Sequence, residues 1–286
     1  MNPEVRDFVE GCDRVLVVGS IMSDFNTGAF TAQLDPARTM TIYHHRTEVG
    51  GKTYPNVEMS DLLAVLVQRL PKRNWPRIEA TSLGPIKGQG DDAITADTLY
   101  PRWADFLRPD DILIAETGTA SMGLGFARMP RGATFHNQTL WGSIGWATPA
   151  AFGAAVAAPD RRIVLVTGDG SHQLTAQEIS QFGRLGLRPI VFVLNNDGYL
   201  IERLLCKEPA TAYNDIALRR YAELPQALGC DGWFTVRATT CKELDRAMEQ
   251  ATYASAGAYI EVVTDAYAAS PLALQLHDAV KTLYKS

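Results

Sequence analysis

The sequence predicts an α/β protein with a doubly wound, mostly parallel sheet, preceded by a smaller and incomplete αβ unit. Two short apolar runs, 163–167 and 190–194, are rich in β-branched residues and lack alternation, which is typical of parallel strands covered on both faces. The segment between them has the length of a crossover helix, so the three pieces predict a βαβ unit. Strand-like runs at 112–115 and 258–263 extend the pattern.

The composition is that of an ordinary globular protein. The 286 residues carry a net charge of −5, and 46% of them are hydrophobic. No basic patch favours a nucleic acid or an anionic membrane as a partner. The first residues show no signal-peptide pattern, no apolar run approaches about 18 residues, and the four dispersed cysteines have no metal-binding spacing. We therefore expect a soluble, cytoplasmic protein with free thiols.

Residues 1–72 predict the smaller unit. Strands are expected at 14–18 and 40–43, followed by a helix at 60–70 that Ser60 caps. So few strands leave an unpaired sheet edge and bury only a small hydrophobic core. This favours an incomplete Rossmann-like αβ half-domain. His44 and His45 follow the second strand, and we expect both to be surface residues.

A linker is predicted at 73–94, and a second domain at 95–286. The stretch 71–90 loses hydrophobic periodicity and gathers proline and glycine. A helix is expected at 95–107, and the strand that follows it ends in Glu116, Thr117, Gly118 and Thr119. An alanine-rich helix at 149–158, a helix capped near Thr240 and an amphipathic helix at 271–284 complete the domain.

Polar residues follow both strands of the βαβ unit. Asp169 lies just past the end of the first strand and Asn196 just past the end of the second, so a right-handed crossover should place them side by side on the ligand-binding edge of the sheet. One carboxylate and one amide oxygen suit Mg²⁺, which completes its coordination with water and phosphate oxygens. Gly168 and Gly170 allow close approach of a phosphate, and Ser171 offers a hydroxyl at a helix start. These residues predict a magnesium diphosphate site.

The spacing of these motifs carries a family resemblance. GDGS at 168–171 and NDGY at 196–199, with 27 positions from Asp169 to Asn196, resemble the thiamine-diphosphate signature of the pyruvate decarboxylase superfamily. The first 70 residues resemble the second half of the central domain in pyruvate and indolepyruvate decarboxylases. The run YNDIALRRYAELPQALGC, at 213–230, resembles the indolepyruvate and phenylpyruvate decarboxylase branch.

The resemblance implies a site for thiamine diphosphate and Mg²⁺. The metal would be held by Asp169, Asn196 and the backbone carbonyl of Gly198. Ile144 would lie beneath the cofactor and hold it bent, so that its amino group lies next to the reactive ring carbon. The residues implied in cofactor binding are Thr117, Thr119, Gly142, Ser143, Ile144, Gly168, Asp169, Gly170, Ser171, Asn196, Gly198, Tyr199 and Ile201.

The implied activity is non-oxidative decarboxylation of a 2-oxo acid to an aldehyde and CO₂, with indolepyruvate, phenylpyruvate and pyruvate as open alternatives. Glu202 matches the glutamate specific to the decarboxylases. We expect its carboxyl to have a pKa raised by burial and to act in proton transfer. The sequence departs from these relatives at 204–209, where LLCKEP replaces their histidine-glycine pair.

Three interpretations remain open. In the family, a glutamate from the pyrimidine-binding domain of a neighbouring subunit activates the cofactor, and no segment of this sequence can be assigned to that domain. The chain is therefore expected to be inactive alone, and to work as a homo-oligomer or with a second chain that supplies the domain. The alternatives are a truncated, non-catalytic fragment or cofactor-binding subunit, and a Rossmann-type dehydrogenase. The last is disfavoured because no GxGxxG follows a strand.

Overall fold

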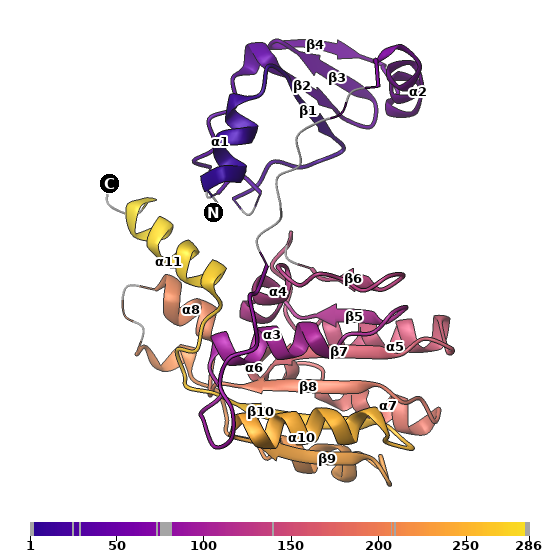
Figure 1. Ribbon diagram of the computed structural model, residues 1–286, viewed down its shortest axis with the longest axis vertical. Coiled ribbons are helices and arrows are strands. Elements are labelled where there is room, and N and C mark those ends of the chain that lie inside the picture. Colours follow the sequence, from indigo (N-terminus) through magenta and orange to yellow (C-terminus); the bar gives the residue numbers. More distant parts are fainter. Residues whose placement is uncertain are drawn as a thin grey trace. The chain divides into compact units, whose positions relative to one another are not determined.

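The chain forms two compact units, Met1–Thr81 and Ser82–Ser286 (Figure 1). The structure, a computed structural model, describes residues 3–24, 26–28, 30–72, 74, 82–138, 140–206, 208 and 210–283. Of the linker expected at 73–94, residues 73 and 75–81 lie outside the described residues. Residues 82–94 belong to the second unit, where Asp92 O and Gly90 O accept hydrogen bonds from Cys241 N and Lys242 N. No described helix is long and apolar enough to cross a membrane.

The first unit contains a mixed sheet. Its described elements are α1 (Pro3–Gly11), β1 (Val15–Val18), the 3₁₀ turn η1 (Pro36–Arg38), β2 (Thr39–Ile42), β3 (Arg46–Val49), β4 (Lys52–Pro55) and α2 (Met59–Arg69). Among the described residues the strand order is β1-β2-β3-β4. The pair β1–β2 is parallel, whereas β2–β3 and β3–β4 are antiparallel.

Two features of this unit differ from the prediction. The hairpin β3–β4 was not expected; its two-residue turn, Gly50 and Gly51, has positive φ angles of 56° and 78°, as tight hairpin turns require. Ser60 does not cap α2, because Glu58 precedes the helix and Met59 N donates to the carbonyl of His44 instead. The strands predicted at 14–18 and 40–43 correspond to β1 and β2 within one residue at each end.

The second unit is built on a parallel sheet. Its described elements are α3 (Ala96–Phe106), β5 (Ile112–Ala115), α4 (Thr119–Leu124), β6 (Thr134–His136), α5 (Ala147–Ala157), β7 (Ile163–Gly168), α6 (Asp169–His172), η2 (Ala176–Glu178), α7 (Ile179–Arg184), β8 (Ile190–Asn195), α8 (Leu200–Leu205), η3 (Ala212–Asn214), η4 (Tyr221–Glu223), α9 (Leu224–Ala227), β9 (Phe234–Ala238), α10 (Cys241–Thr252), β10 (Ala258–Val263) and α11 (Pro271–Leu283). Among the described residues six strands pair, all in parallel, in the order β6-β5-β7-β8-β10-β9 (Figure 1).

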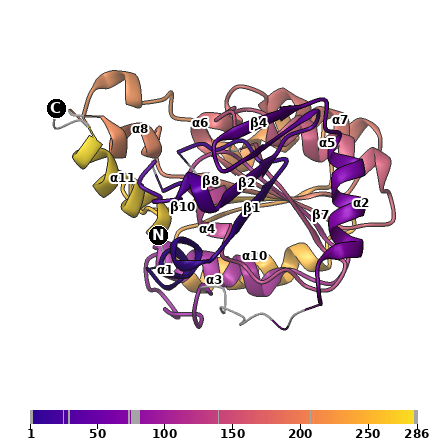
Figure 2. The ribbon, with the colours of Figure 1, turned by 90° about the horizontal axis from the view of Figure 1, so that it is seen from above.

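Helices cover both faces of this sheet. Side chains such as Val164 and Phe192 pack with α3, α4 and α10, whereas their strand neighbours Leu165 and Val193 pack with α5 and α7. Successive residues of a strand point to opposite faces, so both faces are apolar and the strands lack alternation. Figure 2 shows α3 and α10 along one side of the strands and α5 and α7 along the other. The predicted doubly wound α/β fold is confirmed.

The strand order positions the site. From β5 the chain moves outward to β6 and then returns to the other side of β5 as β7, and β8 follows beyond it. The loops after β5 and β7 therefore leave the sheet next to each other where the winding direction reverses. Open α/β sheets bind ligands at such a switch point, beyond the carboxyl ends of the strands.

The segment after β7 differs from the single crossover helix that was predicted. It divides into α6, which has only four residues, the turn η2, and α7. The loop before α5 contacts the segment between α6 and η2: Thr175 Oγ1 donates a 3.0 Å hydrogen bond to Gly145 O. Ser171 therefore lies within one short turn, which has little of the dipole that a long helix would provide. Tyr284, the expected last residue of α11, lies outside the described residues.

Candidate functional site

Asp169 lies at the centre of the candidate site. It directly follows β7 and is 1% exposed. Its Oδ1 accepts from Gly170 N at 2.7 Å, and its Oδ2 accepts from Asn196 N at 3.1 Å and Gly198 N at 3.2 Å. Burial raises the pKa of Asp169 to about 6, although these N–H groups oppose the rise. The ends of β7 and β8 thus meet as expected, through the carboxylate of one strand and the backbone that follows the other.

The turn after β8 carries the second half of the expected metal site. Asn196 is buried, and its Nδ2 has no hydrogen-bond partner among the described residues. Gly198 O accepts from Leu200 N at 3.1 Å, which leaves a second lone pair on that carbonyl. A buried N–H group without a partner is costly, so Asn196 Nδ2 points to an acceptor that the described chain does not supply, such as a phosphate oxygen. The side-chain oxygen of Asn196 is the atom that could bind a cation. The donor set of Asp169, Asn196 and Gly198 fits a hard cation with oxygen ligands.

Arg203 holds this turn in place and was missed by the sequence analysis. Its buried guanidinium donates to Asn196 O at 3.2 Å, to Asp197 O at 2.5 Å and to Asp215 Oδ1 at 3.2 Å. The turn brings the chain so close that a Cβ on Gly198, whose φ is 145°, would lie 2.2 Å from Arg203 Nη2. Only glycine fits there. An arginine one position after Glu202 gives no sequence signal for this role.

The glycines of the GDGS motif have different surroundings. A Cβ on Gly170 would lie 2.5 Å from Tyr199 Cε1, whereas a Cβ on Gly168 would meet nothing within 4 Å. Gly170 therefore allows the ring of Tyr199 to approach the backbone, and Gly168 leaves open space beside the carboxylate of Asp169. Ser171 is buried in the same turn. This geometry can accommodate a phosphate group next to the metal ligands.

The loop after β5 meets the same region. Thr119 O accepts a 2.7 Å hydrogen bond from Tyr100 OH, and Thr117 Oγ1 is buried without a partner among the described residues. Gly118 has a φ of 120°, and a Cβ there would lie 3.8 Å from Ile201 Cγ1. The structure thus brings Thr117 and Thr119 close to α8 and Ile201. A buried hydroxyl without a partner is a second position that a ligand could satisfy.

Glu116 ties this loop to the tryptophan-rich loop before α5, which comprises residues 140–146. Its carboxylate is fully buried and accepts from Thr117 N and from Ala147 N, each at 3.1 Å. Burial raises the pKa of Glu116, and the backbone N–H groups counter part of the rise. From the sequence, Glu116 was expected only as part of the segment that ends a strand. Its signal was a carboxylate at the end of a buried strand, directly before a glycine-containing loop.

The tryptophan-rich loop is anchored at one end and exposed at the other. Besides the bond from Thr175, a Cβ on Gly145 would lie 2.9 Å from Leu174 Cβ. This close packing places the loop beside the GDGS turn. Gly142, Ser143 and Ile144 are exposed, and the apolar side chain of Ile144 is 40% exposed.

Glu202 does not have the environment that we expected. It lies on α8, whose Leu200 and Leu204 pack against α4 and α11, and its own side chain points outward and is exposed. The predicted burial of this carboxyl is therefore wrong for the described chain. The helix turns its apolar residues inward and leaves Glu202 on the opposite side, one residue after Ile201.

His172 completes the interior behind the site. It is fully buried, with Nδ1 3.2 Å from Thr148 Oγ1 and Nε2 2.8 Å from Tyr259 OH. Burial lowers the pKa of His172 to about 3, so the imidazole is neutral near pH 7. These contacts join α6 to α5 and β10, and they fix the turn that follows Asp169.

Comparisons with known proteins agree with this geometry. Residues 116–262 match the family described as thiamine pyrophosphate enzyme, C-terminal TPP binding domain. The chain is 39% identical over 251 residues to an alpha-keto-acid decarboxylase of Mycobacterium ulcerans, covering 86% of this chain and 44% of the relative. It is 38% identical over 253 residues to the one of Mycobacterium avium, covering 87% and 45%. The chain thus spans less than half the length of these curated relatives.

Solved structures share the fold. The benzoylformate decarboxylase of Polynucleobacter necessarius matches with a TM-score of 0.70 at 17% identity, covering 92% of this chain and 51% of that chain. The 4-hydroxybenzoylformate decarboxylase of Rhodococcus jostii matches with a TM-score of 0.68 at 20% identity, covering 91% and 50%. The resemblance drawn from the sequence motifs is confirmed. The chain therefore belongs to the thiamine pyrophosphate enzymes: it carries their C-terminal cofactor-binding domain and is a homologue of the alpha-keto-acid decarboxylases.

Proposed function

We propose that the second unit binds Mg²⁺ and thiamine diphosphate at the carboxyl ends of β5, β7 and β8, as part of a 2-oxo acid decarboxylase. The observation that carries the proposal is the buried carboxylate of Asp169 beside the buried side chain of Asn196, whose unpartnered Nδ2 would donate to a phosphate oxygen. A carboxylate offers about four acceptor positions, and the three backbone N–H groups described above occupy three. Oδ1 accepts one of these bonds, from Gly170 N, and has acceptor capacity for a cation.

The positions of the residues support the following roles. Asp169, Asn196 and the carbonyl of Gly198 would hold the metal. Gly168, Gly170, Ser171 and Tyr199 would surround the diphosphate, because they form the turn beside that metal site. The organic part would lie against the loops and helix beyond them, which contain Thr117, Thr119, Gly142, Ser143, Ile144 and Ile201.

Thiamine diphosphate, when bound, supplies a cationic ring that accepts the electrons left behind as CO₂ departs from the 2-oxo acid. Glu202 is placed next to Ile201 at the rim, where its carboxyl can exchange protons with the substrate. Ile201 would pack against the substrate side chain. Indolepyruvate, phenylpyruvate and pyruvate are the candidate substrates, in line with the alpha-keto-acid decarboxylase relatives.

We further propose that a pyrimidine-binding domain of another subunit, in a homo-oligomer or a hetero-oligomer, covers this rim. The support is the exposure of the rim: Trp141 is 73% and Ile144 40% exposed, and Glu202 also faces outward. The alternative, a cofactor-binding subunit or fragment without catalysis, has the same half-site and differs only in lacking this cover.

Two measurements separate these functions. Calorimetric titration of the chain with thiamine diphosphate should show Mg²⁺-dependent binding that Asp169→Ala abolishes; unchanged binding in that variant would refute the metal site. Aldehyde release from the three 2-oxo acids should be absent for the chain alone and appear when a chain that carries a pyrimidine-binding domain is added. Steady turnover by the chain alone would refute the need for a partner, and binding without turnover in every mixture would favour the non-catalytic subunit.

A further inference from the structure

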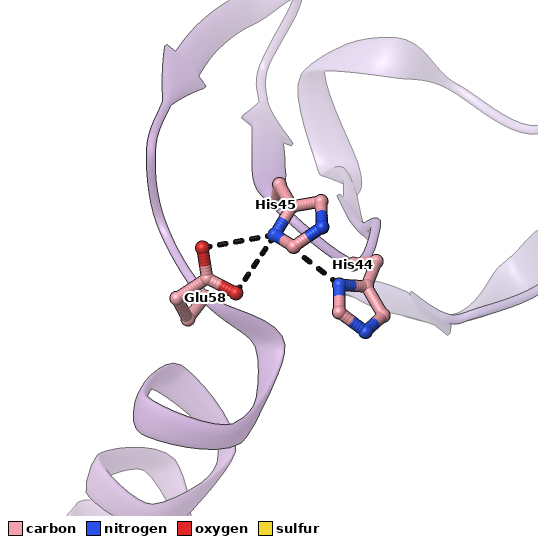
Figure 3. A group of neighbouring side chains, drawn as sticks. All are labelled: His44, His45 and Glu58. Carbon is pink, nitrogen blue, oxygen red and sulfur yellow. Dashed lines mark hydrogen bonds and ion pairs between the residues drawn. The ribbon is translucent and has the colours of Figure 1, made fainter.

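Three potential metal ligands meet in the first unit, outside the thiamine diphosphate machinery. His44 and His45 form the turn between β2 and β3, and Glu58 directly precedes α2 (Figure 3). His45 Nδ1 lies 2.9 Å from Glu58 Oε1 and 2.8 Å from Oε2, and His44 Nδ1 lies 3.2 Å from His45 Nδ1. One ligand atom of each residue lies within 4.8 Å of the other two, and this is the one such group of three among the described residues. Both histidines are exposed, as expected.

The backbone holds these side chains together. Tyr43 N donates to Arg46 O at 2.8 Å and closes the turn, and Met59 N donates to His44 O at 3.0 Å. The second bond fixes the start of α2 to the turn. Glu58 occupies the residue before the helix, but its side chain accepts no capping hydrogen bond from the helix. Its carboxylate is instead directed at His45 (Figure 3).

Protons alone satisfy this cluster poorly. A neutral or charged imidazole carries at most one hydrogen on Nδ1. If His45 Nδ1 donates its hydrogen to Glu58, this nitrogen has no lone pair left to accept a bond from His44. The same hydrogen must then serve His44 Nδ1 as well as the two carboxylate oxygens. If His44 Nδ1 donates to His45, the His45 nitrogen faces the carboxylate with its lone pair. In the first arrangement one hydrogen is shared among three acceptors, and in the second the lone pair of His45 faces the carboxylate of Glu58 at 2.8 Å.

A single cation would satisfy all three ligand groups. Zinc binds histidine nitrogen at about 2.0–2.1 Å, so two of its ligands lie about 2.9 Å apart at a right angle and about 3.4 Å apart at the tetrahedral angle. The separations of 2.8–3.2 Å from His45 Nδ1 to Glu58 and to His44 fall close to this range, and the ligand atoms of all three residues lie within 4.8 Å of one another. Two imidazoles with one carboxylate suit zinc, whereas Mg²⁺ prefers oxygen ligands alone. We propose that His44, His45 and Glu58 bind Zn²⁺, with water in the fourth position.

Such an ion would join the β2–β3 turn to the start of α2. The first unit is small, and the described part of α2 has no fully buried side chain, so its apolar packing against the sheet is limited. Metal binding to a folded site adds directly to the stability of the fold. This site goes beyond the proposed decarboxylase function and does not depend on it.

The test is equilibrium dialysis of the untagged full chain against Zn²⁺, with excess Mg²⁺ to occupy oxygen sites. Asp169→Ala removes the other expected metal site, and in this background we expect one equivalent of zinc. His44→Ala and His45→Ala should each weaken binding at least about tenfold, because even indirect supports of a metal site are worth about that much. Glu58→Gln, which keeps the side-chain shape, should weaken it similarly. Visible absorption of bound Co²⁺ should be lost in the same variants.

His136→Ala is the matched control, because His136 is also exposed and contacts only a threonine hydroxyl among the described side chains. It should bind zinc like the parent. The proposal is overturned if the parent binds no zinc, or if His45→Ala and Glu58→Gln bind as tightly as His136→Ala. Loss in His45→Ala and Glu58→Gln with full binding in His44→Ala would overturn the three-ligand site and leave a His45–Glu58 pair. Circular dichroism of each variant verifies the fold.

Discussion

Replacing Asp169 by asparagine should change the pH dependence of stability in the second unit. Burial raises the pKa of Asp169 from 3.8 to about 6, so the folded unit binds this proton more tightly than the unfolded chain does. The stabilisation is fully present below pH 3.8 and is lost as the pH rises through about 6. At about 1.36 kcal/mol per pH unit, the full loss is about 3 kcal/mol, of which about 1.4 kcal/mol falls between pH 5 and pH 7.5.

Asparagine does not titrate, so Asp169→Asn should remove this component. The free energy of unfolding of the parent minus that of the variant should be about 1.4 kcal/mol larger at pH 5 than at pH 7.5. Urea unfolding without Mg²⁺ measures both values, with the fluorescence of Trp103, Trp146 and Trp233 reporting on the second unit. All other titrating groups cancel in the difference between the two proteins.

Equal differences at the two pH values would refute the reasoning, because they would show that Asp169 titrates normally in the folded unit. Addition of Mg²⁺ and thiamine diphosphate provides an internal check. A cation binds the ionised carboxylate, so the ligands should stabilise the parent more at pH 7.5 than at pH 5 and should leave Asp169→Asn nearly unaffected.

Three further predictions concern the supports of the site. Gly170→Ala places a Cβ 2.5 Å from the ring of Tyr199, and should weaken cofactor binding at least about tenfold in calorimetry, the equivalent of about 1.4 kcal/mol. Arg203→Lys loses part of the hydrogen bonding to two backbone carbonyls and should lower the urea-unfolding free energy by about 2 kcal/mol, with weaker Mg²⁺ binding. In the parent, the free energy of unfolding should fall by about 1.6 kcal/mol between pH 6.5 and pH 5 because of His172, and His172→Gln should remove this fall. The pKa of His172 is lowered from 6.5 to about 3, so its stabilisation is present above 6.5 and is lost as the pH falls.

Each has its own control. Gly153→Ala, in α5, meets nothing within 4 Å and should keep full cofactor affinity; equal loss in both glycine variants would contradict the role of Tyr199. Normal stability of Arg203→Lys would show that a single ammonium group can hold the turn. An unchanged acid slope in His172→Gln would mean that another group causes the acid sensitivity.

Four strands of the second unit, β5, β7, β8 and β10, were predictable because nearly all of their residues are buried and apolar. β5 and β10 were predicted with the bounds that the structure has, and β7 and β8 within one residue. A parallel strand covered on both faces must be apolar at successive positions, and no other short element has this pattern so clearly. The hairpin β3–β4 lacks that signal, since all four residues of β4 are exposed. The glycine pair at its turn, Gly50–Gly51, was the one local signal that could have indicated the hairpin.

The positions of Asp169 and Asn196 could also be inferred, because parallel topology alone brings the ends of β7 and β8 together. The roles of Glu116 and Arg203 could not be inferred. Their partners depend on how loops fold over the sheet edge: Glu116 reaches Ala147 across 31 positions. The burial expected of Glu202 was wrong for a related reason, since the family motif fixes its place on α8 but the exposure of that face depends on what covers it.

The two ends of the candidate site differ in how far they are organised within the described chain. At the metal end the carboxylate of Asp169 is buried and bonded, and Arg203 holds the turn that contains Asn196. At the substrate end Ile144 and Glu202 are exposed. Preorganised, water-excluded groups bind with little reordering cost, whereas proton transfer by a carboxyl near neutral pH needs burial to raise its pKa. We therefore expect binding of magnesium diphosphate and competence for decarboxylation to be separable, with the first fixed by this unit and the second conferred by whatever surface closes over Glu202.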